Sequence, residues 1–533
     1  MPTLNFKGKS FVHNHHLAVK YHQLVPKKDK SLTNKVSLHD NLIVQGDNLK
    51  ALKALLPTYA GKVKCIYIDP PYNTGNESWA YNDKVNSPMM REWLGKVVDK
   101  DDLTRHDKWL CMMMPRLKLL QELLAEDGVI VISIDDNEQH RLRVLCDEIF
   151  GEDKFVVDIA WRSSDSSNHD AKTFSVDFNS TLIYSKSAEW YPNELKRTDK
   201  NNQHYKNPDN DPKGSWFAGN LTSPNPRPNL RYNVISPSGV VIEPPANGWR
   251  WKEDKMKEMI SERIIVFSED GKRITKKTYL VDQEGIAPSN IWFDINETGH
   301  NRQSKYEQIN LFPEKQTADQ FKTPKPLKFI RRILELTTDQ NSIILDSFAG
   351  SGTTAHAVLD LNKEDGGNRK FILVEMEDYA NDITTERVRR VIQGVPTSKN
   401  FKEGTGGTFS YFELGEPIEM ESILRGENLP GYEEFAKYLF YTATGEEFDS
   451  SQVNESTNYI GTSKDYEIYL FYKPDIDYLK STALTLDRAK SLGKHNGKKR
   501  LVFAPAKFVD NHTLTDLRIE FSQLPFEIYK LKS

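Results

Sequence analysis

A chain of 533 residues is too long for one hydrophobic core and predicts two or three domains. The formal net charge of −4 excludes a uniformly basic nucleic-acid coat, so any contact with an acidic polymer must come from local clusters. There is no signal peptide and no apolar run approaching 18 residues, so we expect a cytoplasmic protein with no membrane contact. The three cysteines lack metal-ligand spacing, and we expect reduced thiols and no metal site.

In chain order, residues 1–35 are polar and are predicted to pack on the surface as a leader. A strand over 41–45 follows and ends in Gly46-Asp47-Asn48, just before a helix with apolar residues at helical spacing. Asp47 is therefore either the cap of that helix or a carboxylate at the edge of a sheet, and the residues alone favour neither role.

The next apolar run, 65–68, ends abruptly in Asp69-Pro70-Pro71-Tyr72, as a buried parallel strand does at the edge of a sheet. Open α/β sheets bind their ligands at that edge. Prolines lack an N–H and hold φ near about −65°, which leaves the Pro70 carbonyl without a partner inside the loop. Asp69 and that carbonyl can accept the two hydrogens of an exocyclic amine, while Tyr72 can stack on a planar ring. A flipped adenine needs these groups; a plain Pro-Pro loop is the alternative.

The polar, aromatic-rich segment 73–108 is predicted either to close over this edge or to form an insertion packed on itself. A helix from Trp109 and a strand over 129–134 then complete an α/β unit. Strands over 155–161 and 180–185 follow it.

The composition changes at about residue 190, where asparagine, proline and isolated aromatics begin to dominate. Only short strands around Val240 and Ile264 are predicted. Sequence readout of DNA needs side chains that fit a groove, and this segment carries candidates for it. The candidates are Arg227, Arg231, Arg250, Lys272 and Arg273, with Trp249, Trp251, Lys276 and Lys277 beside them. Each of them could equally be a solvated surface residue.

A second glycine-rich loop follows a strand over 342–345. Its residues are Asp346, Phe348, Ala349, Gly350, Ser351, Gly352 and Thr353. Glycines permit a tight turn and a close backbone approach, and the helix that starts at Thr353 directs free N–H groups at an anion. A dinucleotide-binding loop would need a third glycine where Ala355 stands.

Two flanking residues complete this picture. Lys325 lies in the segment Thr323-Pro324-Lys325-Pro326, just before a predicted helix. Either this segment only caps the helix, or Lys325 supports a ligand. The strand over 371–374 ends in Glu375, which is well placed to accept the two hydroxyls of a ribose.

Asp69-Pro70-Pro71-Tyr72 resembles the catalytic tetrapeptide of the amino-methyltransferases that modify adenine N6 in DNA. Residues 343–355 resemble the S-adenosylmethionine loop of the same enzymes, and the tetrapeptide precedes this loop, as in their β-class. Together with Gly46-Asp47-Asn48 and residues 407–414, these motifs look most like the modification (Mod) subunits of type III restriction-modification systems.

The resemblance implies an α/β fold: a Rossmann-like S-adenosylmethionine-dependent methyltransferase domain with a mixed, mainly parallel sheet and a circularly permuted motif order. Residues 36–185 and 323–420 would pair in one sheet as this catalytic domain. Residues 186–322 would be an inserted target-recognition domain, and residues 421–533 a small C-terminal α/β interaction module.

The resemblance also implies roles. Asp69 and the Pro70 carbonyl would bind the amine of a flipped adenine, with Pro71 and Tyr72 completing the catalytic loop. S-adenosyl-L-methionine would be held at its adenine by Asp47, at its ribose by Glu375, and at its methionine end by Lys325 and the glycine-rich loop. The implied partners are double-stranded DNA, a second copy in a homodimer, and a restriction subunit with helicase and nuclease activity. A solitary adenine methyltransferase, an RNA or protein methyltransferase, and a non-catalytic DNA-binding relative are the alternatives.

Overall fold

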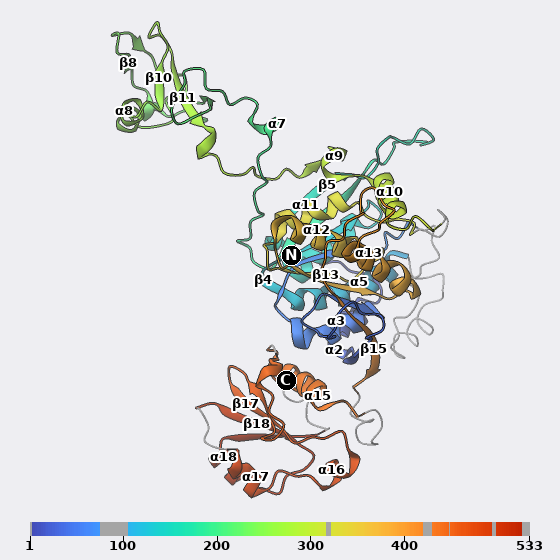
Figure 1. Ribbon diagram of the computed structural model, residues 1–533. Coiled ribbons are helices and arrows are strands. Elements are labelled where there is room, and N and C mark those ends of the chain that lie inside the picture. The colour runs from blue at the N-terminus through green and yellow to red at the C-terminus, as the bar shows by residue number, and fades with distance from the viewer. Residues whose placement is uncertain are drawn as a thin grey trace. The chain divides into compact units, whose positions relative to one another are not determined.

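The computed structural model describes residues 3–74, 105–315, 321–418, 429–446, 448–492 and 497–524 (Figure 1). They divide into a main unit, residues 1–191 with 289–533, and a second unit, residues 192–288. Most of the predicted insertion 73–108 lies outside the described residues. Within the described ranges, no helix is long and apolar enough to cross a membrane.

The main unit is built on a ten-stranded sheet with the strand order β1-β15-β2-β14-β13-β3-β4-β6-β5-β12. Its strands are β1 His22–Pro26, β2 Leu42–Gln45, β3 Val63–Ile68, β4 Leu124–Ile134, β5 Phe155–Arg162, β6 Phe178–Ser185, β12 Ile291–Trp292, β13 Ile343–Asp346, β14 Lys370–Glu375 and β15 Ser410–Pro417. The six neighbours from β15 to β4 run parallel, whereas β6 is antiparallel to both of its neighbours.

Strands from the two ends of the chain alternate in this sheet, because β13 and β14 lie between β2 and β3. Leu345 of β13 is in register with Ile66 of β3, and Glu375 of β14 with Gln45 of β2. The pairing of the two halves in one sheet, predicted from the motif order, is therefore present. Since these strands are parallel, all four end at the same edge.

Helices cover both faces of the sheet, as the near-continuous burial of its parallel strands requires (Figure 1). On one face α3 Asn48–Tyr59, α5 Arg105–Leu123 and α6 Gln139–Phe150 pack in sequence, and on the other α11 Leu327–Thr337, α12 Thr353–Asp365 and α13 Glu386–Gln393. Shorter helices are α1 Lys9–Val12, α2 His15–Ala18, α9 Ile295–Thr298 and α10 Asn301–Leu311.

The predicted leader does more than pack on the surface. Residues 22–26 form β1, which pairs antiparallel with β15 at one edge of the sheet. Leu24 is buried there, and Val12 of α1 is buried in the same core. The polar composition of this segment did not predict an edge strand, because its few apolar residues show no period.

The second unit has its own small core of Val234, Trp249, Met256, Met259 and Ile265. A three-stranded antiparallel sheet, β10-β11-β7, joins β7 Trp216–Gly219, β10 Ile265–Phe267 and β11 Ile274–Tyr279. A hairpin of β8 Val234–Ile235 and β9 Val241–Ile242 and the helices α7 Asp199–Asn202 and α8 Glu253–Ser261 complete it. The strands predicted around Val240 and Ile264 are present as β9 and β10. This unit falls inside the predicted segment 186–322.

Two of the candidate groove contacts are interior residues of this unit. Trp249 is 4% exposed and its Nε1 donates to the Tyr232 carbonyl at 2.7 Å. Lys277 is 5% exposed, and its ammonium binds Asp209 at 2.5 Å and also Asp211. The expectation of surface contacts is wrong for these two, because charge and aromaticity in a sequence do not reveal which face of a strand is buried. Arg227, Arg231, Arg250, Lys272 and Arg273 are exposed.

Replacing Lys277 with methionine is expected to destabilise the second unit, because the buried ammonium binds both Asp209 and Asp211, and the two carboxylates lose their cation. The exposed Lys272→Met is the control, with an expected change within about 0.5 kcal/mol. Hydrogen exchange over residues 192–288, resolved by mass spectrometry, measures the stability of the second unit in the two variants. Equal protection in the two variants would contradict the role of Lys277.

The C-terminal segment adds a smaller α/β sheet, which belongs to the main unit and does not form a separate unit. Its sheet has the order β16-β17-β18-β19, with β17, β18 and β19 parallel. The strands are β16 Tyr459–Thr462, β17 Tyr466–Leu470, β18 Lys499–Ala504 and β19 Ile519–Gln523, and the helices are α15 Tyr432–Thr444, α16 Ile476–Ser481, α17 Leu486–Ser491 and α18 Asn511–Asp516. α15 packs against α3, and the Tyr441 hydroxyl donates to Glu122 at 3.3 Å.

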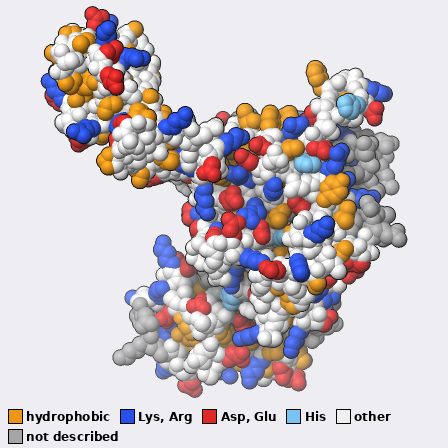
Figure 2. Space-filling view, turned by 45° about the horizontal axis from the view of Figure 1, so that its top comes forward, with side chains coloured by type: hydrophobic (Ala, Val, Ile, Leu, Met, Phe, Trp, Pro, Cys, Tyr) orange, Lys and Arg blue, Asp and Glu red, His pale blue; other side chains and the backbone are white. Residues whose placement is uncertain are grey.

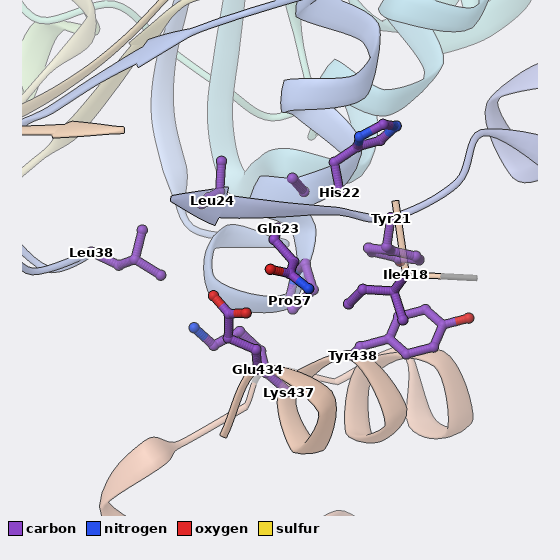
Figure 3. A pocket seen from close by; sticks show the side chains of 11 residues that line it. Tyr21, His22, Gln23, Leu24, Leu38, Pro57, Ile418, Glu434, Lys437 and Tyr438 are labelled. Carbon is purple, nitrogen blue, oxygen red and sulfur yellow. The ribbon is translucent and has the colours of Figure 1, made fainter. Parts of the chain in front are cut away.

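A cavity of about 40 Å³ lies between β1, α3 and α15. Glu434 and Lys437 of α15 reach toward Gln23 of β1 in it (Figure 3). A space of this size has room for one or two waters and not for a cofactor or a base.

Candidate functional site

The edge where the parallel strands end gathers four predicted carboxylates. Asp47 follows β2, Asp69 follows β3, and Asp346 and Glu375 are the last residues of β13 and β14. Asp69 and Glu375 both act on Asp346, since their negative charges help to raise its pKa. Residues from positions 47 to 375 of the chain therefore form one site.

The Asp69–Tyr72 loop carries polar atoms that lack partners. Lys325 forms an ion pair with Oδ2 of Asp69, and its ammonium lies 5.1 Å from the centre of the Tyr72 ring. Oδ1 of Asp69 and the hydroxyl of Tyr72 are buried and accept or donate no hydrogen bond among the described residues. Such groups are costly in a folded protein and typically mark a place where a ligand binds.

Contacts to α5 and α6 hold this loop in place. Trp109 Nε1 donates to the Pro71 carbonyl at 2.7 Å. Asn73 is buried with φ at 58°, and its amide donates to Glu138, which is also 2.5 Å from Nδ1 of His106. Sequence reasoning missed Asn73 and Glu138; the acidic run after the strand over 129–134 was the available signal.

The glycine-rich loop is a tight turn between β13 and α12. Gly350 and Gly352 have φ of 52° and 80°, in the left-handed region, and the Gly352 N–H bonds the Ala349 carbonyl at 2.8 Å. A Cβ at Gly350 would lie 3.1 Å from Phe321 Cζ, and one at Gly352 would lie 3.1 Å from the Thr384 carbonyl. Both positions therefore need glycine for conformation and for space.

Asp346 organises this loop from beneath. It is 3% exposed and accepts hydrogen bonds from the Phe348 N–H at 3.1 Å and the Thr354 hydroxyl at 2.5 Å. Burial raises its pKa to about 7. Because each oxygen already has a donor, the structure places Asp346 as a support of the loop, and Phe348 and Ala349 are buried beside it.

Glu375 joins the same loop to β14. Its Oε2 accepts the Gly350 N–H at 2.7 Å, and its Oε1 accepts the N–H groups of Met376 and Glu377 at 2.9 and 3.1 Å. Oε2 thus keeps one lone pair for a further donor. Burial raises the pKa of Glu375 to about 7 despite these three bonds.

This raised pKa predicts a pH-dependent stability. Between the ordinary glutamate pKa of 4.5 and about 7, the folded protein keeps a proton on Glu375 that the unfolded chain releases, so stability falls as pH rises through this window. Relative to Glu375→Gln, the wild type is expected to lose roughly 2–3 kcal/mol between pH 5 and 7.5. Urea unfolding of both proteins without ligand measures the difference, and parallel pH curves would contradict it.

Asp47 is the cap of α3, since its side chain accepts the Lys50 N–H at 3.1 Å. The structure adds a neighbour that the sequence did not suggest. Asn48 is buried, donates to the Ser347 carbonyl at 3.1 Å and accepts from Arg116 Nε at 2.6 Å. Asn48 therefore ties the start of α3 to the glycine-rich loop; a polar residue opening an apolar helix face was the only signal.

Lys325 and Thr353 meet on the other side of the loop. The Thr353 hydroxyl lies 3.2 Å from the Lys325 carbonyl, so the segment that carries the Asp69 partner is fixed to the start of α12. The five exposed candidates for DNA contacts belong to the second unit. Among the residues that the structure describes, no group of three His, Cys, Asp or Glu side chains could hold a metal ion.

With this geometry established, comparison with known proteins gives a decisive result. A family model for N6/N4 methyltransferases, described as DNA methylase, matches residues 63–386. The chain belongs to this DNA methylase family. The match begins at β3 and ends in α13, so it contains both loops of the site.

Among the relatives, the type III StyLTI Mod subunit of Salmonella typhimurium is 32% identical over 71% of this chain and 61% of its own length. The EcoP15I Mod subunit of Escherichia coli is 32% identical over 66% of this chain and 60% of its own. The type II methyltransferase M.KpnI of Klebsiella pneumoniae is 30% identical over 62% of this chain and 79% of its own length. The chain thus spans less than two thirds of these two Mod subunits.

Solved structures also match. The cytosine-N4-specific PvuII DNA methyltransferase is 13% identical, covers 65% of this chain and 86% of its own, and has a TM-score of 0.35. The M1.HpyAVI–SAM complex is 15% identical, covers 65% of this chain and 98% of its own, and has a TM-score of 0.31.

Proposed function

We propose that this protein transfers a methyl group from S-adenosyl-L-methionine to adenine N6 in double-stranded DNA, as the modification subunit of a type III restriction-modification system. One observation carries the proposal. The pairing of β3 with β13 brings the Asp69–Tyr72 loop and the glycine-rich loop to one edge, where Asp69 Oδ1 and the Tyr72 hydroxyl are buried and have no hydrogen-bond partner among the described residues. Family membership and the similarity to Mod subunits support it.

The residues at this edge fit S-adenosyl-L-methionine. The tight turn at Gly350 and Gly352 would form a backbone cradle for the ligand, and the free N–H groups at the start of α12 suit a carboxylate. Glu375 keeps an acceptor for a ribose hydroxyl, and Asp47 stands at the end of β2 for the adenine amine. When bound, this cofactor supplies an electrophilic methyl group.

The chain's own residues would then position the target base. Lys325 occupies Oδ2 of Asp69, which leaves Oδ1 as the acceptor for one hydrogen of the adenine amine, while the Pro70 carbonyl takes the other. These two bonds direct the nitrogen lone pair toward the methyl donor. Tyr72 contributes its ring as a stacking surface for the flipped base. Holding the two reactants in line supplies several kcal/mol of the barrier reduction.

DNA recognition is assigned to the second unit, through Arg227, Arg231, Arg250, Lys272 and Arg273. Lys and Arg side chains are interspersed with Asp and Glu on the face drawn in Figure 2, in keeping with the net charge of −4. Local arginines therefore supply the positive charge. The remaining inferences are a cytoplasmic location, a homodimer and a restriction subunit as partner, with residues 421–533 as an interaction module.

Incubation with labelled S-adenosylmethionine and unmethylated genomic DNA, followed by single-molecule sequencing, tests the reaction and its target together. N6-methyladenine at one recurrent sequence is expected. Parallel reactions with total RNA and with a protein extract test the alternative substrates. Cofactor binding without methylation of any substrate would overturn the proposal and indicate a non-catalytic relative.

A further inference from the structure

Beneath the glycine-rich loop lies a fully buried arginine, Arg387 of α13. Its Nη1 donates to the Ser351 hydroxyl at 3.0 Å and to the Thr353 hydroxyl at 2.8 Å, and Nη2 lies 3.3 Å from Nδ1 of His356. Its Nε has no partner among the described residues, and none of their carboxylates forms an ion pair with it. A buried guanidinium that forms no ion pair is costly and often serves a function.

Arg387 carries a positive charge, whereas its hydrogen-bond partners are neutral. Burial and the charge of Arg387 hold the pKa of His356 well below its usual range, so the imidazole is neutral. Burial lowers the pKa of Arg387 to about 10, and the charge of Glu307 opposes that shift. The guanidinium is therefore protonated at neutral pH, and its nearest polar contacts are neutral groups.

The hydrogen atoms around Arg387 can be assigned, because a guanidinium only donates. The Ser351 and Thr353 oxygens both accept from it, so their own hydrogens must point elsewhere. The Thr353 hydrogen has the Lys325 carbonyl as acceptor at 3.2 Å. The Ser351 hydrogen has two possible acceptors: the second lone pair of the Thr353 oxygen, 3.2 Å away, and a ligand bound at the start of α12, toward which the hydroxyl can rotate.

We propose that Arg387 is a positioning residue for the carboxylate of the cofactor's amino acid end, acting through the hydroxyls of Ser351 and Thr353. The inference rests on the proposed function, since it assumes an S-adenosylmethionine site. The buried guanidinium adds its charge to the partial positive charge of the α12 N-terminus. Glu307 interacts electrostatically with Arg387 but does not form an ion pair with it. A bound carboxylate adds a second negative charge near the guanidinium, so recognition of this end of the ligand is stronger than the loop backbone alone would allow.

Two ligands that differ only in this end provide the test. S-adenosylhomocysteine carries the amino acid, whereas 5′-methylthioadenosine lacks it. Calorimetric titration of the full chain is expected to show that Arg387→Met weakens S-adenosylhomocysteine binding by about tenfold to a hundredfold, with 5′-methylthioadenosine changed by less than about twofold. Arg387→Lys, which keeps the charge, is expected to recover part of the loss.

Ser351→Ala removes the connecting hydroxyl at little structural cost and is expected to show the same selectivity, so the test stands even if Arg387→Met does not fold. Equal weakening of both ligands in Ser351→Ala and in a folded Arg387 variant would overturn the inference and leave Arg387 a structural residue. A wild type that binds neither ligand would overturn the proposed function, and this inference with it.

Discussion

Replacing Asp69 with asparagine is expected to lower the rate of methyl transfer by a factor on the order of 10²–10³, with S-adenosylhomocysteine binding unchanged. The variant keeps the size of the side chain but loses the charge that holds Lys325 and the carboxylate oxygen that is free to accept from the adenine amine. Single-turnover transfer to an oligonucleotide that contains the recognised sequence measures the rate, and calorimetric titration measures the binding.

Asp127 offers a matched control, because it also forms an ion pair with a lysine, Lys64, at 2.5 Å, but its side chain is 75% exposed. Asp127→Asn is expected to leave the rate within about twofold, since surface pairs contribute little. If Asp69→Asn retained most of the wild-type rate, Asp69 could not be the acceptor of the amine and the mechanism would have to be abandoned.

Replacing Gly352 with alanine is expected to weaken S-adenosylhomocysteine binding by about tenfold or more. The new Cβ would lie 3.1 Å from the Thr384 carbonyl. Thr384 belongs to the π-helical turn Asn381–Thr385, and its hydroxyl donates to the Gly350 carbonyl at 2.6 Å. Displacement of Thr384 would therefore move both glycines of the cradle.

Gly366→Ala is a control that shows how much of the Gly352→Ala effect comes from backbone strain alone. It caps the other end of α12 with φ at 70°, close to the 80° of Gly352, but a Cβ there would meet nothing within 4 Å. Gly366→Ala is expected to cost about 1 kcal/mol of stability and to leave binding unchanged. Thermal unfolding and calorimetric titration of both variants distinguish the two effects. Equal binding losses would show that helix strain, and not the cradle, controls affinity.

The strands of the site could be predicted because their signals are local. Apolar runs that end in a carboxylate, a proline or a glycine mark β2, β3, β13 and β14, and the structure places each within a residue or two of its predicted bounds. The second unit was harder to predict, because its strands are short and its core is small. Nothing near Lys277 in the sequence indicates that it lies between two aspartates from the start of the unit.

The sequence by itself determined the two loops, their order along the chain and the chemistry that their residues allow. The tertiary structure decided which groups meet at the sheet edge. Lys325 reaches Asp69 across 256 positions, and Arg387 lies under Ser351 from 36 positions away. Neither contact has a sequence period. The first arises where parallel strands from distant segments end side by side, and the second where α13 packs against α12. Within the described part of the chain, the Asp69 oxygen without a hydrogen bond and the Arg387 guanidinium without an ion pair both follow from that arrangement.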